Sequence, residues 1–134
     1  MSQISLISLG ANQQDPKRQL CLAQAAIQAL PTTYIEHSSS IIKTRAMDYV
    51  RQQDFYNQVL RISTQLSPLN LLNHLQIIEA SLGRVRRSPW GPRMIDIDIL
   101  TYDHLSLNHP RLVLPHPQVE TRSFIKILIQ QVVN

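Results

Sequence analysis

The chain has 134 residues, of which 43% are hydrophobic and 16% charged, with a formal net charge of +4 at pH 7. This composition excludes a disordered or fibrous chain and predicts one globular domain spanning residues 1–134. No stretch approaches membrane-spanning length and no basic leader precedes the first apolar run, so we expect a cytoplasmic protein without membrane contacts.

The first third of the chain predicts a central strand followed by a helix. Residues 3–9 are apolar on both faces, as in a strand that is covered on both sides. Asp15 and Pro16 provide an N-cap and a proline at the first helical position, and apolar residues then recur at helical spacing up to Leu30. The only cysteine, Cys21, excludes an intrachain disulfide, and its place in this apolar pattern predicts a buried thiol.

Two further strands and a second helix follow. Residues 34–44 predict a second strand, and residues 55–65 predict a third, whose side chains alternate between two faces. We interpret the polar residues 45–53 between them as a loop, and a loop of this length between paired strands often serves function. Serine and proline at 67–68 repeat the signal for a helix start, and Gly83 predicts the helix end.

Two aspartates lie in an alternating apolar stretch after the second helix. Within residues 95–100, isoleucines at the odd positions alternate with Asp96, Asp98 and Leu100, which predicts a strand with both carboxylates on one face. A rise of about 3.3 Å per residue separates their Cβ atoms by about 7 Å. Such a pair suits Mg²⁺, which takes one or two protein carboxylates and completes its shell with water and phosphate oxygens. Taken alone, the pattern is more often typical of a solvated sheet edge.

The segment before this strand concentrates positive charge. Arg84, Arg86, Arg87 and Arg93 are four of the thirteen Lys and Arg residues and fall within ten positions, together with the only tryptophan, Trp90. Guanidinium groups bind phosphate oxygens in a bidentate fork and stay charged. Arginines that run into two aspartates therefore predict a metal–polyphosphate site, and the concentration of charge favours a nucleotide over a long nucleic acid.

The C-terminal part predicts small elements and a last helix. Residues 102–111 indicate a polar turn region or hairpin, residues 112–114 a short strand, and residues 120–133 a helix with Phe124, Leu128 and Val132 in register. The order strand, helix, strand, strand, helix, strand predicts an α+β fold. We expect a ferredoxin-like sandwich, an antiparallel sheet with two main helices on one face and the other face free for ligands.

The arginine–aspartate stretch resembles the signature of a known family. Its run Gly-Arg-x-Arg, then Trp-Gly-Pro-Arg-x-x-Asp-x-Asp-Ile-Leu, resembles that of hydroxymethyldihydropterin pyrophosphokinases, which move pyrophosphate from ATP to a pterin alcohol in folate biosynthesis. The accompanying motifs, in order, are Gly10-Ala-Asn12, Asp54-Phe-Tyr-Asn57, the helical run 71–79, Pro115-His116 and Arg122-x-Phe124. The resemblance covers essentially the whole chain and implies the ferredoxin-like fold, a Mg²⁺-dependent diphosphotransferase that releases AMP, and ATP and a reduced pterin as partners. We expect a monomer that binds no nucleic acid.

The resemblance also implies roles for single residues, position by position. Asp96 and Asp98 are the expected ligands of two Mg²⁺ ions and, with Arg84 and Arg93, the expected catalytic residues. ATP is expected at Gln76, Glu79, Arg84, Arg86, Trp90, Arg93, Ile99, Arg111, Leu112, Val113, His116 and Arg122. The pterin is expected at Thr44, Arg45, Met47, Phe55, Asn57, Trp90 and Phe124, with the two phenylalanines stacking on the bicycle and the asparagine hydrogen-bonding its edge. Without the resemblance, polar helix residues such as Gln76 and Glu79 are usually just solvated.

Two other functions stay open. Ser88-Pro89 stands where many family members have an arginine before the tryptophan, and the chain ends at Asn134, before a C-terminal segment usual in the family. These departures keep open a catalytically weak or inactive relative that binds pterin or nucleotide. An RNA-binding module on a ferredoxin-like sheet would also agree with the net charge, but it is expected to place aromatic residues on central strands, and the chain has two Phe and one Trp.

Overall fold

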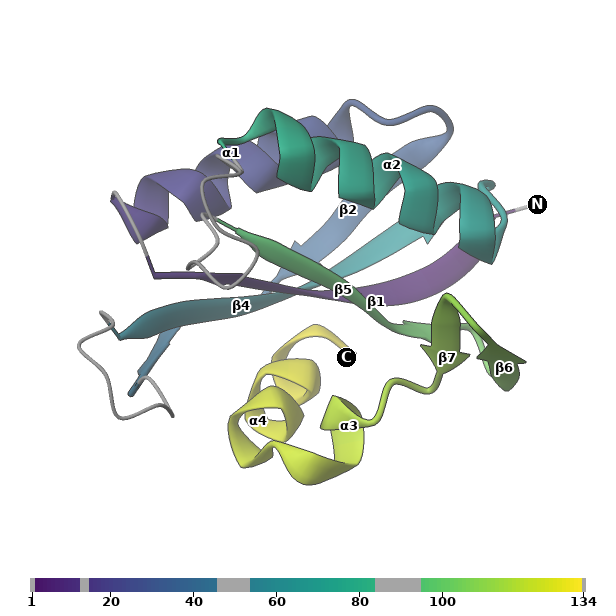
Figure 1. Ribbon diagram of the computed structural model, residues 1–134. Coiled ribbons are helices and arrows are strands. Elements are labelled where there is room, and N and C mark those ends of the chain that lie inside the picture. Colours follow the sequence, from purple (N-terminus) through teal and green to yellow (C-terminus); the bar gives the residue numbers. More distant parts are fainter. Residues whose placement is uncertain (1, 13–14, 46–53, 84–94, 134) are drawn as a thin grey trace.

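The sheet is organised around β1, Gln3–Ala11, which has a neighbouring strand on each side (Figure 1). The computed structural model describes residues 2–12, 15–45, 54–83 and 95–133. Strand β1 pairs antiparallel with β4, Phe55–Thr64, and with β5, Asp96–Tyr102. Residues 5–9 of β1 are buried, including the polar Ser5 and Ser8, as expected of a central strand that is covered on both faces.

The far edge of β4 is covered by two short strands, β2, Thr33–Ser38, and β3, Ile42–Thr44. The prediction of one strand over residues 34–44 is wrong at residues 39–41, where the chain leaves the ladder. Ser39 is buried there, and its hydroxyl accepts a hydrogen bond from the backbone N–H of Val59 at 2.8 Å. The next residue donates its backbone N–H to Gln131 in the C-terminal helix instead of to a strand. These competing partners interrupt the edge strand.

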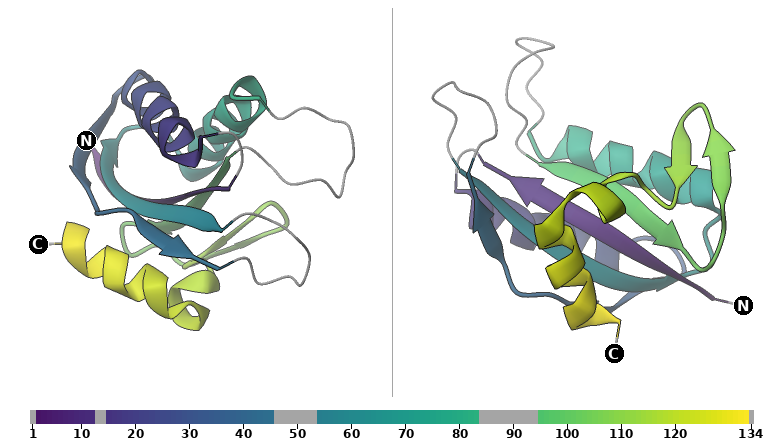
Figure 2. Two further views of the ribbon diagram at one scale, coloured as in Figure 1. Left: turned by 90° about the vertical axis from the view of Figure 1, so that its left-hand side faces the viewer. Right: turned by 90° about the horizontal axis from the view of Figure 1, so that it is seen from below.

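Two helices, α1, Pro16–Gln28, and α2, Pro68–Ser81, pack side by side on one face of the sheet (Figures 1 and 2). With β2 and β3 counted as one edge, the strand order β2-β4-β1-β5 and these two helices form the predicted ferredoxin-like α+β sandwich. Helix positions such as Leu20, Ile27 and Leu75 meet the sheet in one buried cluster. The prediction of a buried Cys21 thiol is wrong, because it lies one residue past Leu20, about 100° around the helix, and is exposed.

The opposite face is partly covered, which corrects the expectation of a face left free for ligands. Two C-terminal helices, α3, Gln118–Thr121, and α4, Ser123–Val132, lie there (Figure 2). The predicted continuous helix over residues 120–133 is wrong at Arg122, whose extended backbone separates them, with φ −115° and ψ 110°. Ile125 takes the core position expected for Phe124. A second hydrophobic cluster, between α4 and the sheet, comprises Leu6, Val59, Leu100, Ile125, Leu128 and Val132.

The predicted turn region contains a hairpin, formed by β6, Leu107–His109, and β7, Leu112–Leu114. It lies beyond the end of β5, next to α2 (Figure 1). In the part of the chain that the structure describes, the helices are all too short or too polar to cross a membrane.

Candidate active site

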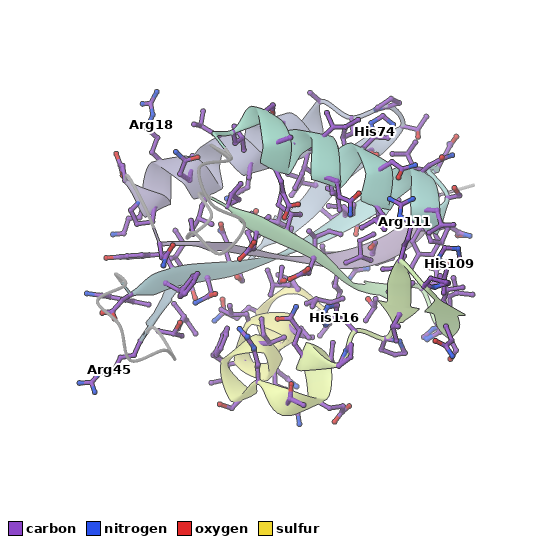
Figure 3. All side chains as sticks on the ribbon, viewed as in Figure 1. Arg18, Arg45, His74, His109, Arg111 and His116 are labelled. Atoms are coloured by element: carbon purple, nitrogen blue, oxygen red, sulfur yellow. The ribbon has the colours of Figure 1, made fainter. Side chains whose placement is uncertain are left out.

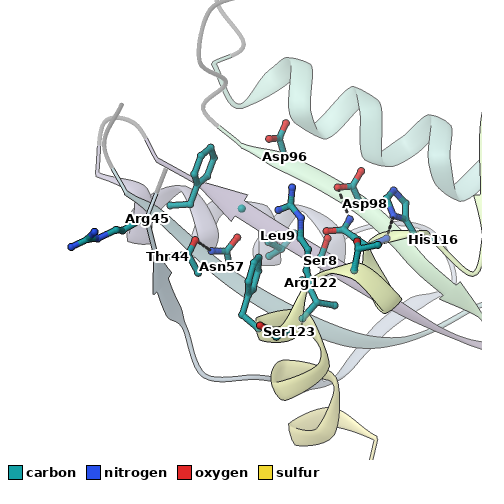
Figure 4. Close-up of a pocket in the computed structure, with 16 residues that line it drawn as sticks. Ser8, Leu9, Thr44, Arg45, Asn57, Asp96, Asp98, His116, Arg122 and Ser123 are labelled. Carbon is teal, nitrogen blue, oxygen red and sulfur yellow. Dashed lines mark hydrogen bonds between the residues drawn. The ribbon is translucent and has the colours of Figure 1, made fainter. Parts of the chain in front are cut away.

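A cleft of about 700 Å³ opens between the sheet and the C-terminal helices (Figure 4). Its walls come from β1, from the ends of β3, β4 and β5, and from the segment 116–125. It brings together nine of the residues that the resemblance implies. These are Thr44, Arg45, Phe55, Asn57, Asp96, Asp98, His116, Arg122 and Phe124.

One end of this cleft combines aromatic rings with a fixed amide. Asn57 is 8% exposed, and its Nδ2 donates to Thr44 Oγ1 at 2.8 Å across the β3–β4 pair. This bond uses an N–H of the amide within the protein and leaves the carbonyl oxygen available as an acceptor. Phe55 lies two residues earlier on the same strand face. From the opposite wall comes Phe124, whose ring centroid lies 5.8 Å from the guanidinium carbon of Arg122.

A row across the sheet connects this aromatic end to the carboxylates. Gly10 of β1 is paired with Asn57 on one side and with Asp96 on the other, so the three residues form one line across β4, β1 and β5. A Cβ atom on Gly10 would lie 3.3 Å from Asn57 Oδ1. The absence of a side chain at this position therefore keeps space open between the amide and the first carboxylate.

A second cleft of about 420 Å³ lies on the α2 side of β5 and next to the hairpin. Arg111, at the hairpin, points to α2 (Figure 3) and donates through Nη2 to Asn73 Oδ1 at 2.6 Å and to Gln76 Oε1 at 3.0 Å. The expected nucleoside contacts are all on this wall, namely Gln76, Glu79, Ile99, Arg111, Leu112 and Val113.

Asp96, Asp98 and His116 line both clefts. The two aspartates project from alternate positions of β5, as the period of two predicts, and both are half-exposed. The backbone N–H of His116 donates to Leu100 O at 2.8 Å, which fixes the histidine segment beside the strand. This shared wall is the place where a ligand in one cleft would meet a ligand in the other.

The donor chemistry of the shared wall fits a hard divalent cation. Two carboxylates face the same space, and no group of three or more His, Cys, Asp or Glu side chains that would enclose a metal occurs within residues 2–12, 15–45, 54–83 and 95–133. Mg²⁺ suits such a partial donor set, since it takes its remaining ligands from water and substrate phosphates. A structural zinc site would need four protein ligands.

Two residues differ from what the sequence indicates. Glu79 is buried at 8% exposure, and its Oε2 accepts a hydrogen bond from the Ile97 backbone N–H at 2.8 Å. It therefore lines the second cleft as an anchored carboxylate and not as a solvated one. Sequence reasoning missed Gln118, which lines the first cleft and donates through Nε2 to Asp98 Oδ2 at 3.1 Å. Its place two residues after His116 was the available signal.

Five expected site residues lie outside the described part of the chain, and the structure gives no account of them. They are Met47, Arg84, Arg86, Trp90 and Arg93.

A family model described as 7,8-dihydro-6-hydroxymethylpterin-pyrophosphokinase (HPPK) matches residues 6–134. The chain belongs to this family. Among curated relatives, the 2-amino-4-hydroxy-6-hydroxymethyldihydropteridine pyrophosphokinase of Haemophilus influenzae is 38% identical over 128 residues, which are 96% of this chain and 80% of that protein. The protein of the same name from Pseudomonas aeruginosa is 38% identical over 125 residues, or 93% of this chain and 77% of that protein.

The HPPK fold also appears in the comparison with solved structures. A crystal structure of an HPPK-DHPS in complex with substrates matches with a TM-score of 0.67 and 15% sequence identity. The match covers 95% of this chain and 39% of the other chain. At this identity it supports the shared fold alone.

Proposed function

We propose that this HPPK-family chain transfers pyrophosphate from ATP to the hydroxymethyl group of 6-hydroxymethyl-7,8-dihydropterin and releases AMP, a step of folate biosynthesis. The observation that carries the proposal is the wall shared by the two clefts. A transfer between two substrates requires a place where both ligands meet, and Asp96, Asp98 and His116 border both cavities. Family membership supplies the identity of the substrates.

The larger cleft is the proposed pterin site. A flat bicycle fits between Phe55 and Phe124, because aromatic rings favour stacked or edge-to-face contacts with a second π-system. The Asn57 carbonyl oxygen accepts from the N–H groups of the pterin edge, since Thr44 already holds the amide nitrogen. Binding in this orientation directs the hydroxymethyl group along the Gly10 row toward Asp96.

The smaller cleft is the proposed nucleoside site. Gln76 and Arg111 form its polar rim and Ile99 and Leu112 its apolar floor. A nucleoside here places the triphosphate over the shared wall, within reach of His116. Arg122 lies on the first-cleft side and supplies positive charge where the transferred phosphates arrive.

The reaction is an in-line displacement. The pterin hydroxyl oxygen forms a bond to the β-phosphorus of ATP, the bond from that phosphorus to the AMP oxygen breaks, and the hydroxyl proton goes to the Asp96 carboxylate. Such transfers depend on positioning and charge neutralisation more than on a covalent nucleophile. Mg²⁺ bound with ATP, held by Asp96 and Asp98, would neutralise phosphate charge and polarise the transferred group.

The proposed partners are small molecules. Clefts of about 700 and 420 Å³ have the size of typical sites for such ligands. We propose that the enzyme acts on them as a cytoplasmic monomer that binds no nucleic acid. Size-exclusion chromatography with light scattering tests the oligomeric state.

Identification of the reaction products by ³¹P NMR tests the function. ATP, Mg²⁺ and the dihydropterin should yield AMP and a pterin diphosphate in equal amounts, and omission of the pterin should abolish AMP. Formation of ADP would contradict transfer of a pyrophosphoryl unit. Binding of pterin or ATP by calorimetry without any AMP would favour the inactive binding relative.

A further inference from the structure

Gln118 is the first residue of α3 and contacts two groups of the shared wall. Its side-chain Nε2 donates to Asp98 Oδ2, and its backbone N–H donates to His116 Nδ1, each at 3.1 Å. Dashed lines from Asp98 and His116 mark both bonds in Figure 4. The next residue of α3 also bonds the histidine, because the backbone N–H of Val119 donates to His116 O at 3.0 Å.

The bond to Asp98 has a direct consequence for a cation. A half-buried aspartate can rotate about χ2, which moves both oxygens. The glutamine amide holds Oδ2 through a charge-assisted hydrogen bond and thereby fixes the plane of the carboxylate. The second oxygen then has a defined direction, which suits the near-ideal octahedral geometry that Mg²⁺ demands.

The bond to His116 defines which ring nitrogen carries the proton. Because Nδ1 accepts from the Gln118 backbone N–H, the neutral imidazole is protonated at Nε2. The ring therefore presents an N–H donor, the group that a phosphate oxygen requires. The backbone N–H of His116 donates to Leu100 O, so the backbone of the histidine is held as well as its ring.

We propose that Gln118 is a positioning residue of the phosphate-transfer site: its side chain orients the metal ligand Asp98, and its backbone fixes the donor tautomer of His116. The proposal rests on the proposed function. One residue thus aligns both the cation and the N–H donor of His116. Both of these groups must act on the same triphosphate.

Gln118→Leu removes the side-chain donor and keeps the backbone N–H. Glu120→Gln is the matched control, because Glu120 lies on the same helix and is exposed. Mn²⁺ serves as the probe in place of Mg²⁺, titrated by electron paramagnetic resonance in the presence of a non-hydrolysable ATP analogue. We expect about tenfold or greater weakening of Mn²⁺ binding in Gln118→Leu, since loss of an outer partner of a metal ligand typically costs 10–100-fold. The control should match the wild type.

Kinetics and NMR complete the test. In Gln118→Leu, kcat should fall by about tenfold or more while KM for the pterin changes less than about twofold. The ¹⁵N spectrum of the His116 ring should show Nδ1 unprotonated in both wild type and variant. Unchanged Mn²⁺ affinity and kcat in Gln118→Leu, or a proton on Nδ1 in the wild type, would overturn the proposal.

Circular dichroism melting curves confirm that each variant is folded, and Gln118→Met provides a second substitution if the leucine variant is not. Methionine is similar in length, carries no charge and lacks the amide donor to Asp98, so Mn²⁺ affinity should again fall. The two proposals fail in different ways. A wild type that makes no AMP contradicts the proposed function, whereas a selective loss of Mn²⁺ affinity in Gln118→Leu still supports the positioning role.

Discussion

The side chain of Glu79 accepts a 2.8 Å hydrogen bond from the backbone N–H of Ile97, the residue between the two aspartates. Both partners are buried, and the bond connects α2 to β5. A buried carboxylate is costly unless it is hydrogen-bonded. This contact therefore stabilises the charge and holds the backbone from which Asp96 and Asp98 project.

Glu79→Leu should destabilise the protein, because it leaves the buried Ile97 N–H without this acceptor. We expect the free energy of unfolding to fall by about 1–3 kcal/mol, the usual cost of an unsatisfied buried donor. Glu79→Gln keeps an oxygen acceptor and should lose less. Urea unfolding followed by circular dichroism measures both, and a leucine variant as stable as the wild type would contradict the structural role.

Gly10→Ala should weaken pterin binding selectively. The new Cβ would lie 3.3 Å from Asn57 Oδ1, and the amide cannot turn away without losing its bond to Thr44. Displacement of one hydrogen-bond acceptor predicts about a 3- to 10-fold higher Kd for the pterin. Calorimetry with a pterin analogue measures this effect, and the Kd for an ATP analogue in the same variant is the internal control. Equal pterin affinity in variant and wild type would show that Asn57 does not contact the ligand.

Removal of either aromatic wall should also act on the pterin alone. Stacking of a heteroaromatic ring on an aromatic side chain contributes about 1–3 kcal/mol, so Phe55→Ala and Phe124→Ala should each raise the pterin Kd by about 10- to 100-fold. Fluorescence titration with a pterin analogue provides the measurement. If the ATP analogue loses affinity instead, the two clefts are assigned to the wrong substrates.

The buried hydroxyl of Tyr102 leads us to expect that the folded protein loses stability at alkaline pH. Its hydroxyl donates to Leu66 O at 2.6 Å, and burial, with a smaller contribution from the charge of Asp103, raises the pKa of Tyr102 above its ordinary value of 10.0. The folded state therefore holds the phenol proton more tightly than the unfolded state does. The resulting stabilisation is complete below pH 10 and is lost as the pH rises through the raised pKa.

Tyr102→Phe isolates this effect. Near neutral pH the variant should be less stable by about 1 kcal/mol, the typical net contribution of one hydrogen bond. Above pH 10 the wild type should lose stability faster than Tyr102→Phe. The difference in free energy of unfolding between the two proteins should therefore narrow. Urea denaturation across this pH range is the test, and a constant difference would contradict the raised pKa.

Local signals in the sequence predict much of this fold. Asp15 and Ser67 accept hydrogen bonds from the backbone N–H groups of Arg18 and Asn70, as expected of N-caps, and Gly83 ends α2 with φ 103°. The period of two places both aspartates on one face of β5. These features depend on residues a few positions apart, and such residues meet whatever the rest of the chain does.

Features that depend on distant partners are not predictable from local patterns. The interruption between β2 and β3 involves Gln131, 91 positions from its partner Ser40. Glu79 is buried where its carboxylate accepts a hydrogen bond from a backbone N–H 18 residues later. For α4, the apolar stripe indicates a buried face but not which side of the sheet it covers.

In the candidate site, too, some features are predictable from the sequence and others depend on distant partners. Every expected site residue that the structure describes lines at least one of the two clefts, and the contacts of these residues with ligands stay predictions. Gln118 was missed because glutamine by itself indicates no function. Its distance of two residues from His116 pointed to the site, but its bond to Asp98 emerges only where α3 meets β5.

Pterin-dependent release of AMP from ATP, compared between wild type, Asp98→Asn and the control Glu120→Gln, tests the central claim most directly. Asparagine keeps the size of Asp98 and removes the charge that a cation requires. We predict AMP formation that requires the pterin in wild type and control, and at least about a 100-fold loss in Asp98→Asn, since loss of an outer partner of a metal ligand alone typically costs 10–100-fold. A wild type that releases no AMP with pterin present, or an Asp98→Asn variant as active as the wild type, would contradict the account.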